Sequence, residues 1–281
     1  MSERIYVRSK SEGYAHPKCY LAHTNGCDSK ITGEHCISHT LLNKIERQNK
    51  TINILGLSWL PKDHWTSVGK KSLVSNVLCS THNSNLSPLD DSIGGLVDAI
   101  YRIDVEYQRQ DPDGLHFKID GSYVERWLLK TILGLVHSGQ IKQPSGELFK
   151  TKPACANLLC VPHARWPHGW GLYVATPSTK VHHSSSFELV PKHQPESGEL
   201  LALGLKFNGI EMHFLMGKPD QPQAFGVLRP CAFIFKKNSV VSKVELSWPR
   251  RKAGGAIVLT HQGTYSGSSP DHSFIAQERD A

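Results

Sequence analysis

Two widely separated segments rich in cysteine and histidine constrain this chain most. The first contains Cys19 and Cys27, and the second contains Cys79 and His82 in the spacing Cys-x2-His. Structural zinc takes four such ligands in a tetrahedron, supplied by two short loops that each hold one side of the metal. The second pair has the spacing of such a loop, whereas the first pair is more widely spaced than usual. We therefore predict a structural zinc site formed by Cys19, Cys27, Cys79 and His82.

Other interpretations of these residues stay open at this stage. His23 lies between the first two cysteines and could replace either of them as a ligand. Buried cysteines also behave as small hydrophobic residues that bind no metal. A second half-site, Cys155-x4-Cys160-x2-His163, has no matching partner segment later in the chain. We therefore predict one zinc site rather than two.

Candidate catalytic residues follow each of the two segments. Glu34 and His35 follow the first cysteine pair, and Asn83 and Asn85 follow His82. Phosphodiester hydrolysis needs a base for water and a cation for the developing charge. Histidine suits the first role, and carboxylate and amide oxygens suit a magnesium-like ion. Neighbouring residues on a strand point to opposite faces, so we expect a bend or bulge there if Glu34 and His35 act together.

This order of residues resembles the HNH endonucleases of the ββα-metal group, over residues 19 to about 90. In that family a hairpin delivers an acidic residue and a histidine, and a helix after a cysteine knuckle delivers a third residue. The resemblance implies that His35 activates water, and that Glu34 and Asn83 bind catalytic Mg²⁺ or Mn²⁺, with Asn85 as the substitute for Asn83. Asn76 corresponds to the asparagine that orients the base.

The chain departs from the family pattern in three respects. The first cysteine pair is widely spaced, the insertion between hairpin and knuckle is long, and His82 stands where a fourth cysteine is commoner. Taken separately, Glu34 and His35 would be a surface pair, and the asparagines would be helix caps. His39 is a lesser candidate for a base or for a phosphate contact.

The pattern along the chain predicts an α+β fold in two parts. Residues 1–140 would form the HNH-like ββα-metal domain with supporting helices, and residues 141–281 a β-rich domain for target recognition or regulation. We expect one helix to begin at Ser87-Pro88 and a second at Ser122, capped by Glu125. Asn208-Gly209 between two alternating runs predicts a β-hairpin. Further strands are expected at 170–176, 187–190, 231–235, 240–248 and 256–260.

Composition adds expectations about partners and location. The formal net charge is +7 and the pI is near 9.0, and a basic surface is compatible with a nucleic-acid partner. We expect this partner to be DNA rather than RNA. No apolar run is long enough for a membrane span, and no secretory signal is recognisable, so we expect a cytoplasmic protein. A homodimer or a regulatory partner is left open.

The leading hypothesis is a metal-dependent HNH endonuclease, a type often found in bacterial anti-phage defence. One alternative is a non-catalytic zinc module that binds nucleic acid or protein. Another places an enzyme in the second half of the chain, where no pairing of nucleophile and base supports it.

Overall fold

The computed structural model describes residues 12–261 except 47–49, 162–163, 177–179 and 182–185, and the chain is a mixed α+β protein, as predicted. The helices are α1 (His39–Ile45), α2 (Ser80–Glu106), α3 (Gly121–His137) and α4 (Ala154–Cys160), with 3-10 turns η1 (Ala22–Thr24), η2 (Lys70–Leu73) and η3 (Pro222–Phe225). Among the described residues, no helix has the length and apolarity that a membrane crossing requires.

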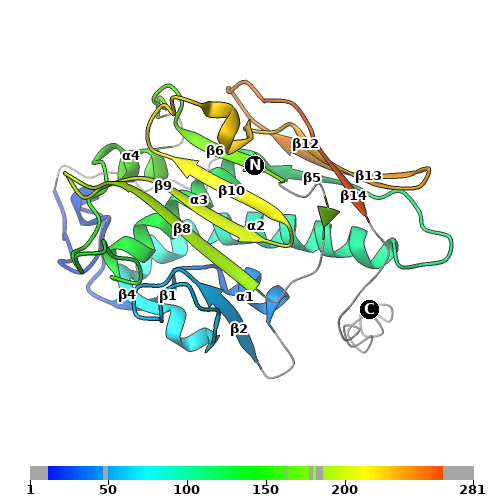
Figure 1. Ribbon diagram of the computed structural model, residues 1–281. Helices are drawn as coiled ribbons and strands as arrows, with labels where there is room; N and C mark the ends of the chain where they lie inside the picture. The colour runs from blue at the N-terminus through cyan, green and yellow to red at the C-terminus, as the bar shows by residue number, and fades with distance from the viewer. Residues whose placement is uncertain (1–11, 47–49, 162–163, 177–179, 182–185, 262–281) are drawn as a thin grey trace.

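The strands form three sheets (Figure 1). The smallest pairs β1 (Ile31–His35) with β4 (Val74–Cys79), antiparallel. The seven-stranded sheet has the order β11 (Val227–Leu228), β6 (Gly171–Ala175), β10 (Ile210–Leu215), β9 (Glu199–Phe207), β8 (Ser186–Gln194), β2 (Thr51–Leu55) and β3 (Thr66–Gly69). The five-stranded sheet has the order β5 (His116–Asp120), β13 (Val240–Ser247), β12 (Ala232–Lys237), β14 (Ile257–His261) and β7 (Lys180–Val181).

The start of α2 differs from the prediction. The helix begins at Ser80, directly after β4, and Pro88 lies inside it rather than at its first position. Proline has no N–H to donate to the Ser84 carbonyl, so one helical hydrogen bond is missing there. The Ser87 hydroxyl donates to that carbonyl instead, at 2.9 Å. The helix therefore continues through the proline, and the prediction of a start at Ser87 was wrong.

The second helix was predicted in the correct place but with the wrong cap. The carboxylate of Asp120 is the N-cap of α3 and accepts from the backbone N–H groups of Ser122 and Tyr123. Glu125, the expected capping partner, points instead into the interior, where it pairs with Arg229. Asp120 already accepts from the free amides of the first helical turn, so Glu125 is not needed as a cap.

The hairpin at Asn208-Gly209 is confirmed. β9 and β10 pair antiparallel with Phe207 opposite Ile210, which leaves a two-residue turn. Asn208 has φ 49° and Gly209 has φ 77°, so both adopt the left-handed conformation that this turn needs. The other predicted strands in this half of the chain are also present, with small shifts at their ends.

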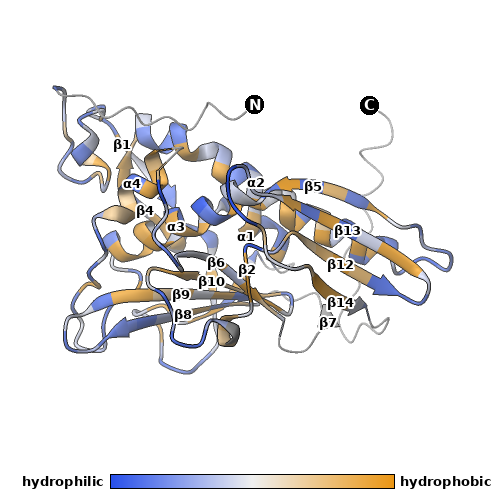
Figure 2. Cartoon of the chain, turned by 90° about the horizontal axis from the view of Figure 1, so that it is seen from above, coloured by the Kyte–Doolittle hydropathy of each residue, from blue (hydrophilic) through white to orange (hydrophobic). Residues whose placement is uncertain are grey.

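Strands from the two halves of the sequence share both large sheets. β2 pairs in parallel with β8, and β5 pairs in parallel with β13. One buried apolar cluster contains residues from Cys19 to Leu259. Figure 2 shows apolar residues along the strands of both large sheets. The division at residue 140 remains a prediction, with strands pairing across it.

Candidate metal centre and adjoining pocket

Four predicted ligands come together in one cluster. The Sγ atoms of Cys19, Cys27 and Cys79 lie 3.3, 3.6 and 3.2 Å from Nδ1 of His82. All four ligand atoms lie within 4.8 Å of one another. Around a tetrahedral zinc ion, a sulfur and a nitrogen ligand are separated by about 3.6 Å. The group can therefore hold a metal ion and is compatible with structural zinc.

The tautomer of His82 suits metal binding. Its Nε2 lies 2.9 Å from the Thr24 hydroxyl, and that hydroxyl donates its own proton to the Leu21 carbonyl at 2.8 Å. Nε2 must therefore carry the hydrogen, which leaves the lone pair of Nδ1 facing the sulfurs. Fixing a ligand histidine through its second nitrogen is common in zinc sites. Thr24 was missed by sequence reasoning, although it lies between the first two cysteines.

Burial disfavours the thiolate form of the cluster cysteines when no cation is bound. It raises the pKa of the Cys19 thiol to about 12 and also raises the pKa of Cys27. Burial, and then the charge of His23, lowers the pKa of His82, so the imidazole is neutral. A dication reverses the balance for the thiols because it stabilises the thiolate directly. The donor chemistry of the cluster thus favours a bound cation.

Backbone hydrogen bonds position the first cysteine loop against β4. The N–H of Tyr20 donates to the Val77 carbonyl at 3.1 Å, and the N–H of Cys27 donates to the Tyr14 carbonyl at 3.0 Å. The left-handed residue of the loop is Asn25, with φ 51°. Asparagine tolerates this conformation, so the turn does not need a glycine at this position. His23 is exposed and lies outside the cluster.

The sheet of β1 and β4 has a bulge beside Glu34, but on the strand opposite the one that carries Glu34 and His35. The register shifts between Thr32 and Glu34, where Gly33 alone lies opposite Asn76 and Val77, so the extra residue is on β4. A pocket of about 180 Å³ lies next to Gly33 and is lined by Glu34, His35 and, from α2, Asn83. Residues 38–40 and Asp90 complete its wall. The Asn83 amide donates to the Thr32 hydroxyl at 3.0 Å. Burial raises the pKa of Glu34, and a hydrogen bond from Asn83 opposes part of this rise.

A buried lysine already contacts the carboxylates of this pocket. Nζ of Lys130, on α3, lies 2.6 Å from Glu34 Oε1 and 2.5 Å from Asp90 Oδ2. Burial raises the pKa of both carboxyls, and the lysine charge only partly opposes this. For Lys130 burial lowers the pKa, but the two carboxylates outweigh it and the net shift is upward. One ammonium cannot balance two carboxylates, so the pocket keeps negative charge or a proton.

His35 is half-buried beside His39, with ring centroids 4.8 Å apart. Burial lowers the pKa of His35, and the charges of His39, Lys70 and Lys130 lower it further. The neutral imidazole that a general base requires is therefore the stable form near neutral pH.

Two predicted residues lie outside the pocket. Asn76 is exposed on β4, within the bulge opposite Gly33, and its Oδ1 is 3.9 Å from where a Cβ at Gly33 would be. Asn85 follows Asn83 by two positions on α2, so it points about 200° away around the helix. Neither side chain lines the pocket.

Sequence reasoning did not place Lys130 or Asp90 in the pocket. A signal for Lys130 existed, because it stands in the run 127–136, where Thr131 is the one other polar side chain. A lysine there is buried, and buried lysines are almost always paired. Asp90 lies seven residues after Asn83, two turns along the same face of α2.

No protein-family model, curated protein or solved structure matches this chain. Among the described residues, Cys19, Cys27, Cys79 and His82 are the one group of three or more histidine, cysteine, aspartate or glutamate side chains close enough to share an ion.

Proposed function

We propose that the protein is a metal-dependent endonuclease of the HNH type, built on a ββα unit with a structural zinc ion. The observation that carries the proposal is that Glu34, His35 and Asn83 line one pocket, at the position where the β1–β4 register is irregular. The metal cluster lies at the junction of β4 and α2 and supports this arrangement.

In the proposed reaction His35 takes a proton from water as the water oxygen bonds to phosphorus and the bond to the leaving oxygen breaks. A divalent cation, when bound, would stabilise the charge that develops on the phosphate. Its oxygen donors would be Glu34, Asn83 and Asp90, since Lys130 contacts one oxygen of each carboxylate and leaves the other. The negative charge that Lys130 leaves unbalanced favours a cation there.

Nucleic acid, DNA rather than RNA, is the proposed substrate. The net charge of +7 favours a polyanion. Lys70, close enough to lower the pKa of His35, lies beside the pocket in an ion pair with Glu46 at 2.7 Å. A phosphate group that binds beside Lys70 would meet the base and the metal donors together.

The test is a plasmid-nicking assay with Mg²⁺ or Mn²⁺ at matched zinc content. We expect His35→Ala to lower the nicking rate by about 10²–10⁴-fold, the usual contribution of a general base. His64→Ala, which removes an exposed histidine outside the pocket, is the matched control and should cut normally. Equal rates for both variants, or no cutting of duplex, single-stranded DNA and RNA by zinc-loaded protein, would contradict the proposal.

The Lys130 ion pairs favour a second candidate function. An ammonium group within 2.6 Å of both acidic side chains supplies, without any metal, part of the charge that a nuclease obtains from its cation. The alternative is therefore a zinc-stabilised module that binds nucleic acid or protein without cutting it. Titration of zinc-loaded protein with Mn²⁺ separates the two, since this module would bind no second ion at the pocket.

A further inference from the structure

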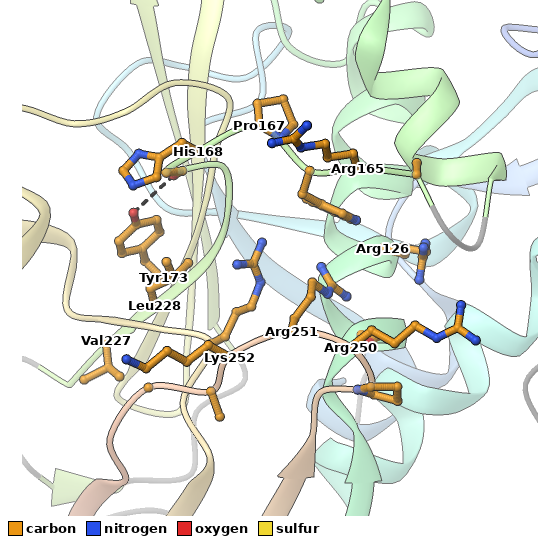
Figure 3. A pocket seen from close by; sticks show the side chains of 18 of the residues that line it. Arg126, Arg165, Pro167, His168, Tyr173, Val227, Leu228, Arg250, Arg251 and Lys252 are labelled. Carbon is orange, nitrogen blue, oxygen red and sulfur yellow. Dashed lines mark hydrogen bonds between the residues drawn. The ribbon is translucent and has the colours of Figure 1, made fainter.

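A much larger pocket is lined by residues that lie far from the metal cluster in the sequence, and it has no part in the proposed nuclease chemistry. It has a volume of about 990 Å³ and lies between the start of α3, the end of α4, β6, β11 and the segment 249–254 (Figure 3). Small-molecule sites in proteins have volumes of roughly 300–1,000 Å³. This pocket therefore has room for a large organic ligand.

The lining of this pocket is strongly cationic. Arg126, Arg165, Lys218, Arg229 and the run 250–252 face it, whereas Asp120 is its one lining carboxylate. Asp120 already accepts two hydrogen bonds from the backbone of α3. Within the described part of the chain, Arg165, Lys218 and Lys252 form no ion pair.

Two of the arginines, Arg229 and Arg251, are held in place by one buried carboxylate. Glu125 is fully buried; its Oε1 accepts from Nε of Arg229 at 2.8 Å, and its other oxygen pairs with Arg251. Arg229 also donates to the Trp170 carbonyl at 2.8 Å. A Cβ at Gly171 would lie 2.3 Å from Glu125 Oε1, so only glycine leaves room for this pair. The guanidinium groups are thus pre-organised for a ligand.

The same arginines crowd one another. Three guanidinium groups lie within 6.0 Å of the centre of the Trp166 ring, and Arg251 is nearest at 4.7 Å. Burial lowers the pKa of Arg126 and of Arg251, and repulsion from a neighbouring arginine lowers each further. A single buried carboxylate does not balance this concentration of charge, so an anion in the pocket would be stabilised.

The opposite wall has a different character. Figure 3 shows Tyr173, Val227 and Leu228 on one side of the pocket, facing Arg126 and Arg250 across it. The Tyr173 hydroxyl is already satisfied by the Gly169 carbonyl at 3.1 Å. Its ring and the two aliphatic side chains therefore offer apolar contact rather than hydrogen bonds.

We propose that this pocket binds a nucleotide that carries more than one phosphate group. Arginine pairs bidentately with phosphate oxygens, which accounts for a cluster of fixed guanidinium groups. The aromatic and aliphatic wall provides the surface against which a flat base packs. The volume of the pocket is that of a small-molecule site, which favours a small ligand over a nucleic-acid strand that binds along an extended groove. This proposal is independent of the nuclease assignment.

The test is calorimetric titration of the zinc-loaded protein, without added Mg²⁺, with four nucleoside triphosphates, a linear dinucleotide with a 5′-triphosphate, pyrophosphate and adenosine. We expect saturable binding of at least one of these nucleotides, weaker binding of pyrophosphate and none of adenosine. Arg165→Ala/Lys252→Ala removes two exposed cations that support no ion pair, and should weaken binding at least about tenfold. Lys62→Ala/Lys236→Ala removes two exposed cations elsewhere and should leave the affinity unchanged.

Three results would overturn the proposal. One is the absence of nucleotide binding at about 1 mM, the weak end of common ligand affinities. Another is an equal loss of affinity in both double variants, which would indicate a general charge effect. The third is binding of a single-stranded oligonucleotide that the pocket variant abolishes while no mononucleotide or dinucleotide binds, since the pocket would then be a nucleic-acid surface.

Discussion

Replacing Lys130 by methionine tests the most consequential contact of the candidate nuclease pocket. Methionine keeps much of the length and apolar stem of lysine but removes the ammonium group. Glu34 and Asp90 would then lose the cation that lies 2.6 and 2.5 Å from their oxygens. Because the lysine side chain is only 4% exposed and that of Glu34 only 7%, water cannot replace the lost contact.

The expected loss of stability follows from that burial. Removing one partner of a buried ion pair costs about 3–5 kcal/mol, chiefly because the other charge is left uncompensated. For a protein of this size the cost corresponds to a fall in Tm of roughly 10 °C. The pKa of Glu34 and of Asp90, raised by burial already, should rise further.

The sign of the pH dependence follows from these raised pKa values. A carboxyl group with a raised folded pKa holds its proton more tightly in the folded than in the unfolded state. The free energy of unfolding therefore falls as pH rises from the unfolded pKa of the group to its folded pKa. The deficit of Lys130→Met should therefore be largest near neutral pH and shrink as pH falls toward the ordinary carboxyl range. Chemical denaturation at several pH values measures it.

Lys44→Met provides the control for the same substitution. Lys44 pairs with Asp98 at 2.7 Å, but the two side chains are 37% and 39% exposed. A pair this exposed is worth about 0–1 kcal/mol, so the control should be nearly neutral. Equal losses for Lys130→Met and Lys44→Met would refute the reasoning from burial. Adding Glu34→Gln and Asp90→Asn to Lys130→Met should recover much of the loss.

Three further predictions concern the metal cluster and the bulge. Thr24→Val removes the acceptor for Nε2 of His82 and should weaken zinc binding by about 10–100-fold in chelator competition, whereas Thr66→Val should not. Gly33→Ala places a Cβ 2.9 Å from Val74 Cγ1 and should reduce nicking by displacing Glu34 and His35; Gly69→Ala, with open space around it, is the control that should cut normally. The nicking rate should rise with pH and reach half its maximum below pH 6.5, because the pKa of His35 is lowered and the neutral imidazole is the base; a midpoint above neutrality would contradict this role.

The metal cluster could be predicted because its determinants are local. Cys79 and His82 occupy the end of β4 and the first turn of α2, so their spacing alone brings them to one side of the metal. A bend or bulge in the strand of Glu34 and His35 was expected from chemistry rather than from propensity. The extra residue is instead on the partner strand β4, and both side chains still line the pocket. Asn76 and Asn85 were assigned from the family pattern alone, and neither lines the pocket.

The sheet arrangement could not be predicted in the same way. β2 and β8 lie more than a hundred residues apart, as do β5 and β13, and both pairs are parallel. Local patterns give the existence of a strand but not its partner, which depends on how the whole core packs. β5 has one half-buried apolar face and charged ends, so its pattern resembled a loop.

Helix α3 shows why charged residues in a sequence can mislead. Glu125, Arg126 and Lys130 would ordinarily indicate a solvated face, yet all three are buried. Each is buried because a partner from another part of the chain satisfies it: Arg229 and Arg251 for Glu125, the Leu158 carbonyl for Arg126, and Glu34 with Asp90 for Lys130. Arg126 and Lys130 are one helical turn apart and therefore share a face. One buried helix thus forms a wall of the cationic pocket at Arg126 and supplies the cation of the acidic pocket at Lys130, so a shift of α3 along its axis would alter both.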